Sequence, residues 1–304
     1  MAVSWKGIFP AITTKFTSQN GLDLALFKKN LNAQLQAGIN GVVLGGTLGE
    51  ASVLTNEEKE ILVKETLLFV DEKVPVIINI AEGSTQIAVE LAQKASLWGA
   101  QGLMLLPPMR YKSDDRETVQ YFKDIAESTD LPIMIYNNPV DYKIDVTIDM
   151  FSELVAVSNI QAIKESTRDV TNVTRLRNAF GNRFHILCGV DTLALEELVL
   201  GADGWVAGLV CAFPAETVAI FKLVKAGRLE EAIAIYRWFM PLLELDIHPK
   251  LVQYIKLAES KTGIGSEIVR KPRLILEGSE RLRIEKIIDD GIKNRPVLPD
   301  YLHL

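Results

Sequence analysis

Eight short apolar segments recur along the chain, and they constrain the fold more than any other feature. Three of them share a pattern in which a glycine, two further residues and a second glycine precede the apolar run, at residues 37–46, 98–106 and 200–208. The first glycine suits the end of a helix, and the second suits a tight turn into a buried strand. Five further apolar runs are interpreted as strands, at residues 7–14, 74–81, 131–137, 159–165 and 184–190.

The spacing of these segments predicts how they connect. The strands start near residues 7, 41, 74, 102, 131, 159, 184 and 204, so consecutive starts are 20 to 34 residues apart. Residues 56–70 and 85–98 repeat apolar side chains every three to four positions, which predicts helices. Thr55 and Glu58 predict a capping box before the first of these helices. Eight strand–helix units favour an α/β fold of the (β/α)8 TIM barrel type over a doubly wound sheet.

No segment rich in Gly, Ser or Pro divides the chain, so its 304 residues are expected to form one large unit. Residues 1–214 are expected to hold the barrel strands and most of the barrel helices. Residues 215–304 follow a helical pattern only. They are expected to hold the last barrel helix and a C-terminal helical extension packed on the barrel.

Charge and cysteine content exclude several classes of protein. Lys and Arg number 33 against 39 Asp and Glu, a net charge of −6, which favours neither nucleic acid nor an anionic membrane as a partner. The two cysteines, Cys188 and Cys211, lie inside apolar runs and are expected to be buried thiols. The amino terminus lacks the pattern of a secretory signal, and the apolar runs are too short to span a bilayer. We expect a cytoplasmic protein.

Lys164 is the first candidate for chemistry, because it lies at the end of the sixth predicted strand. Catalytic residues of such barrels lie at the carboxyl ends of the strands. A lysine among apolar neighbours loses hydration, its pKa falls, and the neutral amine becomes a nucleophile for a carbonyl carbon. A structural lysine paired with Glu165 or another rim carboxylate is an equally open interpretation.

Tyr136 ends the neighbouring fifth strand and is the second candidate. A phenol held near an imine can pass a proton to and from carbon or oxygen. A tyrosine at a strand end is more often a packing residue, but a position beside Lys164 strengthens the catalytic interpretation.

The glycine-rich loop at residues 45–50, which follows the second strand, is the third candidate. Its backbone N–H groups are suited to an anion such as a substrate carboxylate. Its glycines do not match a dinucleotide fingerprint, so a nicotinamide cofactor is disfavoured. Glu50 is expected to have a structural role. The histidines His185, His248 and His303 are too dispersed to predict a metal site.

Three motifs in order, residues 45–50 (GGTLGE), 136–139 (YNNP) and 162–166 (AIKES), resemble the dihydrodipicolinate synthase / N-acetylneuraminate lyase family of Schiff-base barrel enzymes. The resemblance covers nearly the whole chain. It implies that Lys164 forms an imine with C2 of a 2-oxo acid and that Tyr136 shuttles protons. It also implies that Thr47, with the N–H groups of Thr47 and Leu48, binds the substrate carboxylate. No cofactor is implied, and a homotetramer is expected.

Departures from the family pattern bear on the substrate. Leu48 stands where the family loop usually has a second hydroxyl residue, and Asp141 stands where the synthases have an arginine for aspartate semialdehyde. The synthases also have an aromatic pair after the fourth strand, where this chain has Met109 and Arg110, with Tyr111 displaced. These differences argue against dihydrodipicolinate synthesis and predict a different proton relay.

Longer stretches look like the branch that deaminates 1-pyrroline-4-hydroxy-2-carboxylate in hydroxyproline breakdown, which yields 2-oxoglutarate semialdehyde and ammonia. We therefore expect this deaminase activity. The alternatives are an aldolase or dehydratase of a sugar-derived 2-oxo acid, and a barrel that binds a 2-oxo acid without turnover. The predicted catalytic residues are Lys164, Tyr136 and Thr47. The predicted substrate-binding residues are Gly46, Thr47, Leu48, Asn138, Asp141, Gly189 and Asp191.

Overall fold

The computed structural model describes residues 3–108 and 111–304, and within them eight parallel strands form a nearly closed barrel. The strand order is β1-β8-β7-β6-β5-β4-β3-β2. A bridge between Ala11 and Val43 brings the two ends of the sheet together, and the Ile12 N–H donates to the Val43 carbonyl at 3.0 Å. The strands are β1 (Gly7–Pro10), β2 (Val42–Leu44), β3 (Val76–Ile80), β4 (Gly102–Leu105), β5 (Ile133–Asn137), β6 (Ile160–Glu165), β7 (His185–Cys188) and β8 (Gly204–Ala207). The predicted TIM barrel is confirmed.

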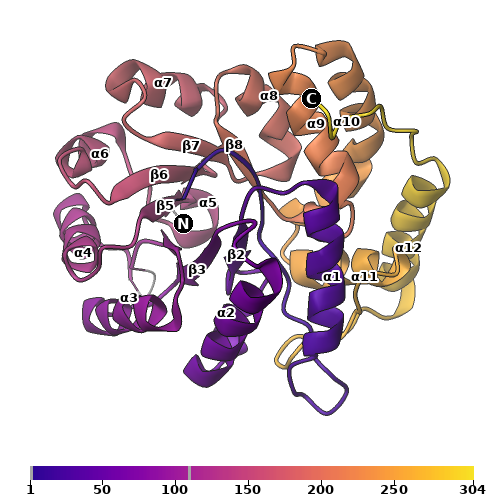
Figure 1. The fold of residues 1–304 in the computed structure, drawn as a ribbon, viewed down its shortest axis with the longest axis horizontal. Coiled ribbons are helices and arrows are strands. Elements are labelled where there is room, and N and C mark those ends of the chain that lie inside the picture. The colour runs from indigo at the N-terminus through magenta and orange to yellow at the C-terminus, as the bar shows by residue number, and fades with distance from the viewer. Residues whose placement is uncertain (1–2, 109–110) are drawn as a thin grey trace.

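Helices surround the strands, as Figure 1 shows. Those that alternate with the strands are α1 (Leu24–Ala37), α2 (Asn56–Val70), α3 (Thr85–Trp98), α4 (Asp115–Glu127), α5 (Pro139–Tyr142), α6 (Ile148–Leu154), α7 (Thr171–Phe180), α8 (Ala194–Val199) and α9 (Pro214–Lys225). Short 3-10 helices are η1 (Ala51–Val53), η2 (Asp191–Leu193), η3 (Leu209–Cys211) and η4 (Glu244–Ile247). The last helices are α10 (Leu229–Leu243), α11 (Leu251–Lys261) and α12 (Gly278–Lys293).

Local sequence signals explain where several helices begin and end. Thr55 and Glu58 form the predicted capping box of α2, with each side chain accepting a backbone N–H from the other residue. Gly38 and Gly99 end α1 and α3 in the left-handed conformation, which lacks a steric penalty only for glycine. Cys188 and Cys211 are buried free thiols, as the apolar runs around them predict.

Strand register places the catalytic candidates side by side. Tyr136 on β5 is level with Lys164 on β6, and Lys164 is level with Leu187 on β7. Side chains at the same level of neighbouring parallel strands project from the same face of the sheet. All three residues are buried, so this level of the sheet faces the interior of the molecule.

The chain after the barrel folds against one side of it, where α9, α10, α11 and α12 lie together on the right of Figure 1. Helix α10 packs on α9, and α11 and α12 pack on each other. Two buried ion pairs join α11 to the segments that follow the first two strands. They link Lys15 to Glu259 and Glu50 to Lys256. The extension is therefore attached at the end of the barrel where the strands finish.

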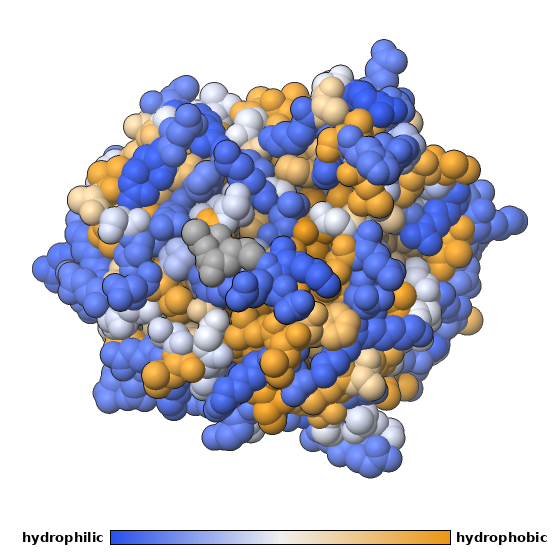
Figure 2. Space-filling model, viewed as in Figure 1, coloured by the Kyte–Doolittle hydropathy of each residue, from blue (hydrophilic) through white to orange (hydrophobic). Residues whose placement is uncertain are grey.

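The face of the molecule in Figure 2 is mostly hydrophilic, with hydrophobic residues gathered in the lower middle of the view. Large apolar side chains on other described helices are also exposed, among them Leu68 on α2 and Leu97 on α3. The expected homotetramer remains a prediction. In the described residues, none of the helices combines the length and the apolar character needed to cross a membrane.

Candidate active site

Lys164 is the penultimate residue of β6, and its side chain is buried at the end of the barrel. Its Nζ lies 3.9 Å from the centre of the Tyr136 ring. Desolvation lowers the pKa of this amine, while the nearby groups Tyr142 and Asp246 act in the opposite direction. Within the described residues, no carboxylate forms an ion pair with Lys164. A neutral amine is the form that attacks a carbonyl carbon.

The structural interpretation of Lys164, a pair with Glu165, is not what the structure shows. The Glu165 carboxylate accepts hydrogen bonds from the Thr167 N–H and the Asn172 amide, each at 2.7 Å. Successive residues of a strand point to opposite faces, so Glu165 turns away from the side that Lys164 faces.

Gly189, predicted as a substrate-binding residue, makes room for the side chain of Lys164. A Cβ atom at this position would lie 2.6 Å from Cε of Lys164 and 2.1 Å from Oγ of Ser166. Any side chain here would displace the amine. The Ser166 hydroxyl is buried and lines the same cavity as Lys164, so it can contact a bound molecule.

Tyr136 is buried, and desolvation raises the pKa of its phenol to about 12. The Asn138 amide donates to the phenol oxygen at 3.1 Å, which leaves the phenol proton free to be donated. The same amide also donates to the Asp141 carboxylate at 2.7 Å. Asn138 therefore connects the Tyr136 phenol to Asp141, and both Asn138 and Asp141 line the cavity.

The short helix α5 explains how Asp141 and Tyr142 reach the site. Asn138 caps this helix by accepting the Asp141 N–H at 3.1 Å, and Pro139 occupies the first helical position. One turn later, the Tyr142 hydroxyl lies 2.7 Å from Oγ1 of Thr47, and its ring packs edge-on against that of Tyr136. Sequence reasoning missed Tyr142. The Asn-Pro start of a helical turn after Tyr136 was the signal that could have found it.

The loop after β2 offers free backbone donors beside Lys164. Gly45 has a φ of 64°, which favours glycine, and a Cβ on Gly49 would lie 2.9 Å from the Gly45 nitrogen. In this tight turn, the N–H groups of Thr47 and Leu48 have no acceptor among the described residues. Leu48 is buried and apolar. The geometry is suited to a carboxylate held by backbone N–H groups.

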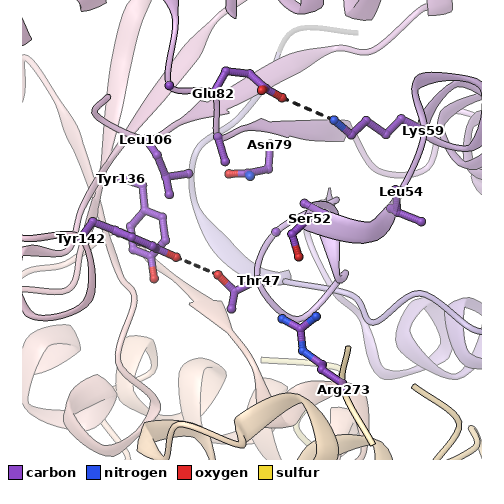
Figure 3. Close-up of a pocket in the computed structure, with 14 residues that line it drawn as sticks. Thr47, Ser52, Leu54, Lys59, Asn79, Glu82, Leu106, Tyr136, Tyr142 and Arg273 are labelled. Carbon is purple, nitrogen blue, oxygen red and sulfur yellow. Dashed lines mark hydrogen bonds and ion pairs between the residues drawn. The ribbon is translucent and has the colours of Figure 1, made fainter. Parts of the chain in front are cut away.

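Two cavities meet at the contact between Thr47 and Tyr142. The first has a volume of about 450 Å³ and contains Lys164, and the second has a volume of about 570 Å³. Both are lined by Gly46, Thr47, Tyr136 and Tyr142. Figure 3 shows the second cavity, in which Lys59 and Glu82 form an ion pair at 3.6 Å across from the Thr47–Tyr142 bond.

Asp191, predicted to bind substrate, instead binds the chain at the end of β8 with its carboxylate. Its carboxylate accepts hydrogen bonds from the Trp205 indole at 2.8 Å and from the Leu209 N–H at 2.7 Å, and also from the Gly208 N–H. Asp191 is fully buried and is not among the residues that line the cavity. It fixes the chain after β8, because a buried carboxylate needs such donors. Sequence reasoning could not see that the oxygens of Asp191 are already occupied.

Glu50 has a structural role, as expected, but within the interior. Lys256 donates to its carboxylate at 2.5 Å, and the Arg270 N–H does so at 3.1 Å. Met109 and Arg110, which stand where the synthases have their aromatic pair, lie outside the described residues.

Three charged or titratable residues that sequence reasoning did not single out as site residues also line the Lys164 cavity, namely Arg168, Asp246 and His248. Arg168 belongs to the loop after β6 and has a φ of 65°, unusual for a residue with a side chain. Asp246 and His248 come from the C-terminal extension. Their sequence neighbourhood carries no local signal of chemistry.

Comparison with known proteins agrees with this geometry. Residues 4–290 match the model of the dihydrodipicolinate synthetase family. A 4-hydroxy-tetrahydrodipicolinate synthase from Exiguobacterium sibiricum is 35% identical over 275 residues, which cover 90% of this chain and 92% of that protein. One from Kosmotoga olearia is 32% identical over 94% of this chain and 98% of that protein.

Solved structures of similar proteins have the same barrel. The dihydrodipicolinate synthase of Thermotoga maritima is 26% identical, with a TM-score of 0.89 over 94% of this chain and 98% of that chain. A dihydrodipicolinate synthase of Bacillus anthracis is 28% identical, with a TM-score of 0.91 over 97% of this chain and 100% of that chain. On the family match, these likenesses and the Lys164 site, the chain belongs to the dihydrodipicolinate synthetase family of Schiff-base-forming, aldolase-like enzymes.

Proposed function

We propose that Lys164 forms a Schiff base with C2 of a small 2-oxo acid and that the chain catalyses an aldol-type reaction at C3 of the resulting enamine. The observation that carries this proposal is a buried lysine amine 3.9 Å from the ring of Tyr136, in a cavity large enough for a small acid and with no ion-paired carboxylate in the described part of the chain. Burial lowers the pKa of the amine and thus favours its nucleophilic form.

The residues suggest an order of steps. The substrate carboxylate binds the free N–H groups of Thr47 and Leu48, and the Lys164 amine adds to C2. The added amine gives one of its protons to the oxygen on C2 and Tyr136 donates a second, so that this oxygen leaves as water and the protonated imine forms. The Tyr136 phenolate then accepts a proton from C3, and the electron pair of that C–H bond forms the enamine. The enamine carbon C3 can make a bond to an aldehyde carbon, and the reverse reaction breaks that bond.

Two observations support the aldol-type reaction. The relatives reported above are named 4-hydroxy-tetrahydrodipicolinate synthase. Arg168 lines the cavity and supplies a cation for an aldehyde substrate that carries a second carboxylate, such as aspartate semialdehyde. The pattern of the synthases that this chain resembles has an arginine for this carboxylate where this chain has Asp141.

A second candidate, the deaminase of 1-pyrroline-4-hydroxy-2-carboxylate, is favoured by Asp141. This carboxylate lines the Lys164 cavity, where it would attract an ammonium group and repel a second carboxylate. Lys164 would add to the ring C=N at C2 and open the ring, which leaves a free amine at the far end. Loss of a C3 proton and of the 4-hydroxyl as water would then give an unsaturated amine that two waters hydrolyse to 2-oxoglutarate semialdehyde and ammonia.

Borohydride trapping tests the proposal that both candidates share. Reduction in the presence of pyruvate should convert the imine to a secondary amine and add the mass of the reduced adduct to the peptide that contains Lys164. Mass spectrometry of the digested protein locates the label. The label should be absent from Lys164→Ala. Labelling of another lysine in the native protein, or no labelling at all, would contradict the proposal.

Turnover measurements separate the two candidates. The purified protein is offered pyruvate with aspartate semialdehyde in one assay and 1-pyrroline-4-hydroxy-2-carboxylate in another, and kcat/KM is compared. The aldol-type proposal expects the first pair to react faster, and Asp141→Arg should raise its kcat/KM further. Faster ammonia release from the ring substrate, and loss of that release in Asp141→Arg, would favour the deaminase instead.

A further inference from the structure

The C-terminal extension contributes one wall of the Lys164 cavity. The 3-10 helix η4 lies against η2 at the rim, and Leu245 within it is buried. From this anchor, Asp246 and the following residues line the cavity, namely Ile247, His248, Pro249 and Leu251. The barrel strands therefore do not enclose the site alone.

The Asp246 carboxyl occupies space that is free only because residue 208 is a glycine. A Cβ atom on Gly208, the residue directly after β8, would lie 2.1 Å from Oδ1 of Asp246 and 3.0 Å from Cδ1 of Leu48. The Gly208 N–H is held by Asp191, so the backbone beneath the carboxyl is fixed. Asp246 is thereby seated between the end of β8 and the loop that carries the free N–H donors.

Charged groups surround this carboxyl on several elements. Burial raises the pKa of Asp246 well above its ordinary value, the Asp191 carboxylate raises it further, and Lys164 lowers it. Asp141 on α5 also raises the pKa, and Arg168 in the loop after β6 lowers it. His248 lies two residues further along and lines the same cavity. These surroundings favour the protonated form of the carboxyl, which can donate its proton to a molecule in the cavity.

Asp246 and Tyr136 approach Lys164 from different sides. Tyr136 lies on β5, which pairs with one edge of the Lys164 strand. Gly208, which supports Asp246, follows β8, and β8 lies beyond β7 on the other edge. Tyr136 is next to the lysine amine, so it serves C2 and C3. A substrate oxygen further along the carbon chain needs a second proton donor.

We propose that Asp246 is a catalytic acid and base for the oxygen on C4 of the substrate. This inference rests on the proposed Schiff base at Lys164. In condensation, the enamine electron pair forms the C3–C4 bond, and the Asp246 carboxyl donates its proton to the aldehyde oxygen. In cleavage, the Asp246 carboxylate accepts the C4 hydroxyl proton as the C3–C4 electron pair returns to the enamine. If the 4-hydroxyl leaves instead, Asp246 protonates it to water while the enamine electrons form a C3=C4 bond.

The Asp246→Asn variant tests this role, because it keeps the shape of the side chain and removes its acid. Three measurements are compared with the native protein. Borohydride trapping with pyruvate reports the imine, and NMR of pyruvate in D2O reports proton exchange at C3. Turnover of pyruvate with aspartate semialdehyde, and of 1-pyrroline-4-hydroxy-2-carboxylate, reports chemistry at C4. Trapping and exchange should stay within about threefold of native, while kcat should fall roughly 10²- to 10⁴-fold, the usual effect of one positioned acid.

Two further variants separate catalysis from structure. Glu244→Gln changes an exposed carboxylate at the start of the same η4 and should leave all three measurements unchanged. Asp246→Ala should regain part of its turnover when formate is added, because formate can supply the missing carboxyl. Thermal unfolding of each variant checks the fold.

Each remaining outcome overturns the inference. Turnover of Asp246→Asn within about threefold of native would show that no acid is needed there. Equal losses of trapping, exchange and turnover would show that Asp246 acts on the Lys164 imine or on the fold. If the native protein forms no adduct and exchanges no C3 proton, the Schiff-base proposal itself fails, and this inference fails with it.

Discussion

Lys15, Lys164 and Lys256 are buried at the same end of the barrel, and they differ in their partners. Lys15, in the segment after β1, lies 2.8 Å from Glu259, and Lys256 on α11 lies 2.5 Å from Glu50. All four of these side chains are fully buried. Lys164 is also buried, but it faces an aromatic ring and a cavity. A buried lysine that forms an ion pair with a carboxylate therefore joins parts of the structure, whereas Lys164 presents its amine to a cavity.

The paired lysines attach the C-terminal extension to the barrel. Glu50 accepts from both Lys256 and the Arg270 backbone, and Arg270 makes two contacts of 2.7 Å with the Glu58 carboxylate on α2. A buried charge without such partners is strongly destabilising. Lys164 avoids that cost because its pKa is lowered and its amine can lose the proton.

Replacing the unpaired lysine should have the largest effect on activity. Lys164→Ala removes the nucleophile, so turnover should fall by roughly 10⁴-fold or more, while the free energy of unfolding should stay near the native value or increase. Steady-state kinetics and urea unfolding measure the two quantities. Substantial residual turnover, with the adduct on another lysine, would show that Lys164 is not the nucleophile and that this role does not distinguish it from Lys15 and Lys256.

Replacing a paired lysine should have the opposite effect. Lys256→Met leaves Glu50 buried without its closest partner, and the free energy of unfolding should fall by about 3–5 kcal/mol. Lys164→Met is the matched control, because it makes the same substitution where no ion pair is lost. Urea unfolding of both variants provides the comparison. Equal losses of stability in the two would show that pairing does not distinguish these sites.

Replacing the phenol beside Lys164 tests whether this lysine has a proton-transfer partner. Tyr136→Phe keeps the ring under the amine and removes the proton donor, so kcat should fall roughly 10²- to 10⁴-fold with a smaller change in KM. Exchange of pyruvate C3 protons should fall as well, unlike in Asp246→Asn. NMR and steady-state kinetics measure both effects. An unchanged exchange rate would show that Thr47 or water, and not Tyr136, removes the C3 proton.

The smallest expected effect is a shift in pH dependence. Only the neutral amine forms an imine, so the rate of borohydride trapping with pyruvate should rise with pH through the pKa of Lys164. Desolvation lowers that pKa, so the midpoint should fall below about 10.4, the ordinary value for lysine. Trapping rates across a pH series locate the midpoint. A midpoint at the ordinary value would mean that burial leaves this amine as basic as one on the surface.

The fold could be predicted from the sequence because its signals are local. The glycines before 42–44 and 102–105, and the apolar runs themselves, encode each strand and turn without reference to the rest of the chain. Lys164 and Tyr136 were predictable for the same reason, since each lies at the end of a recognisable strand. Their relative placement follows from strand register, which brings both to one level.

Other site residues could not be predicted because tertiary contacts position them. Asp246 lies in a helical segment whose sequence does not indicate which turn meets the barrel rim. Asp191 follows a strand end and matches the pattern of a substrate-binding residue, yet Trp205 and the backbone after β8 occupy its carboxylate. Contacts with residues far apart in the sequence decide both cases, at Gly208 for Asp246 and at Trp205 for Asp191.

The origin of the η4 wall outside the barrel has a consequence for how such enzymes diverge. The groups proposed to form and deprotonate the imine lie on β5 and β6, whereas the opposite wall of the cavity includes a segment that contains no strand. Mutations, insertions or recombination in that segment can therefore alter the choice of substrate while the barrel strands and their side chains are inherited intact. Changes in the C-terminal extension alone can therefore give rise to new activities in this lineage.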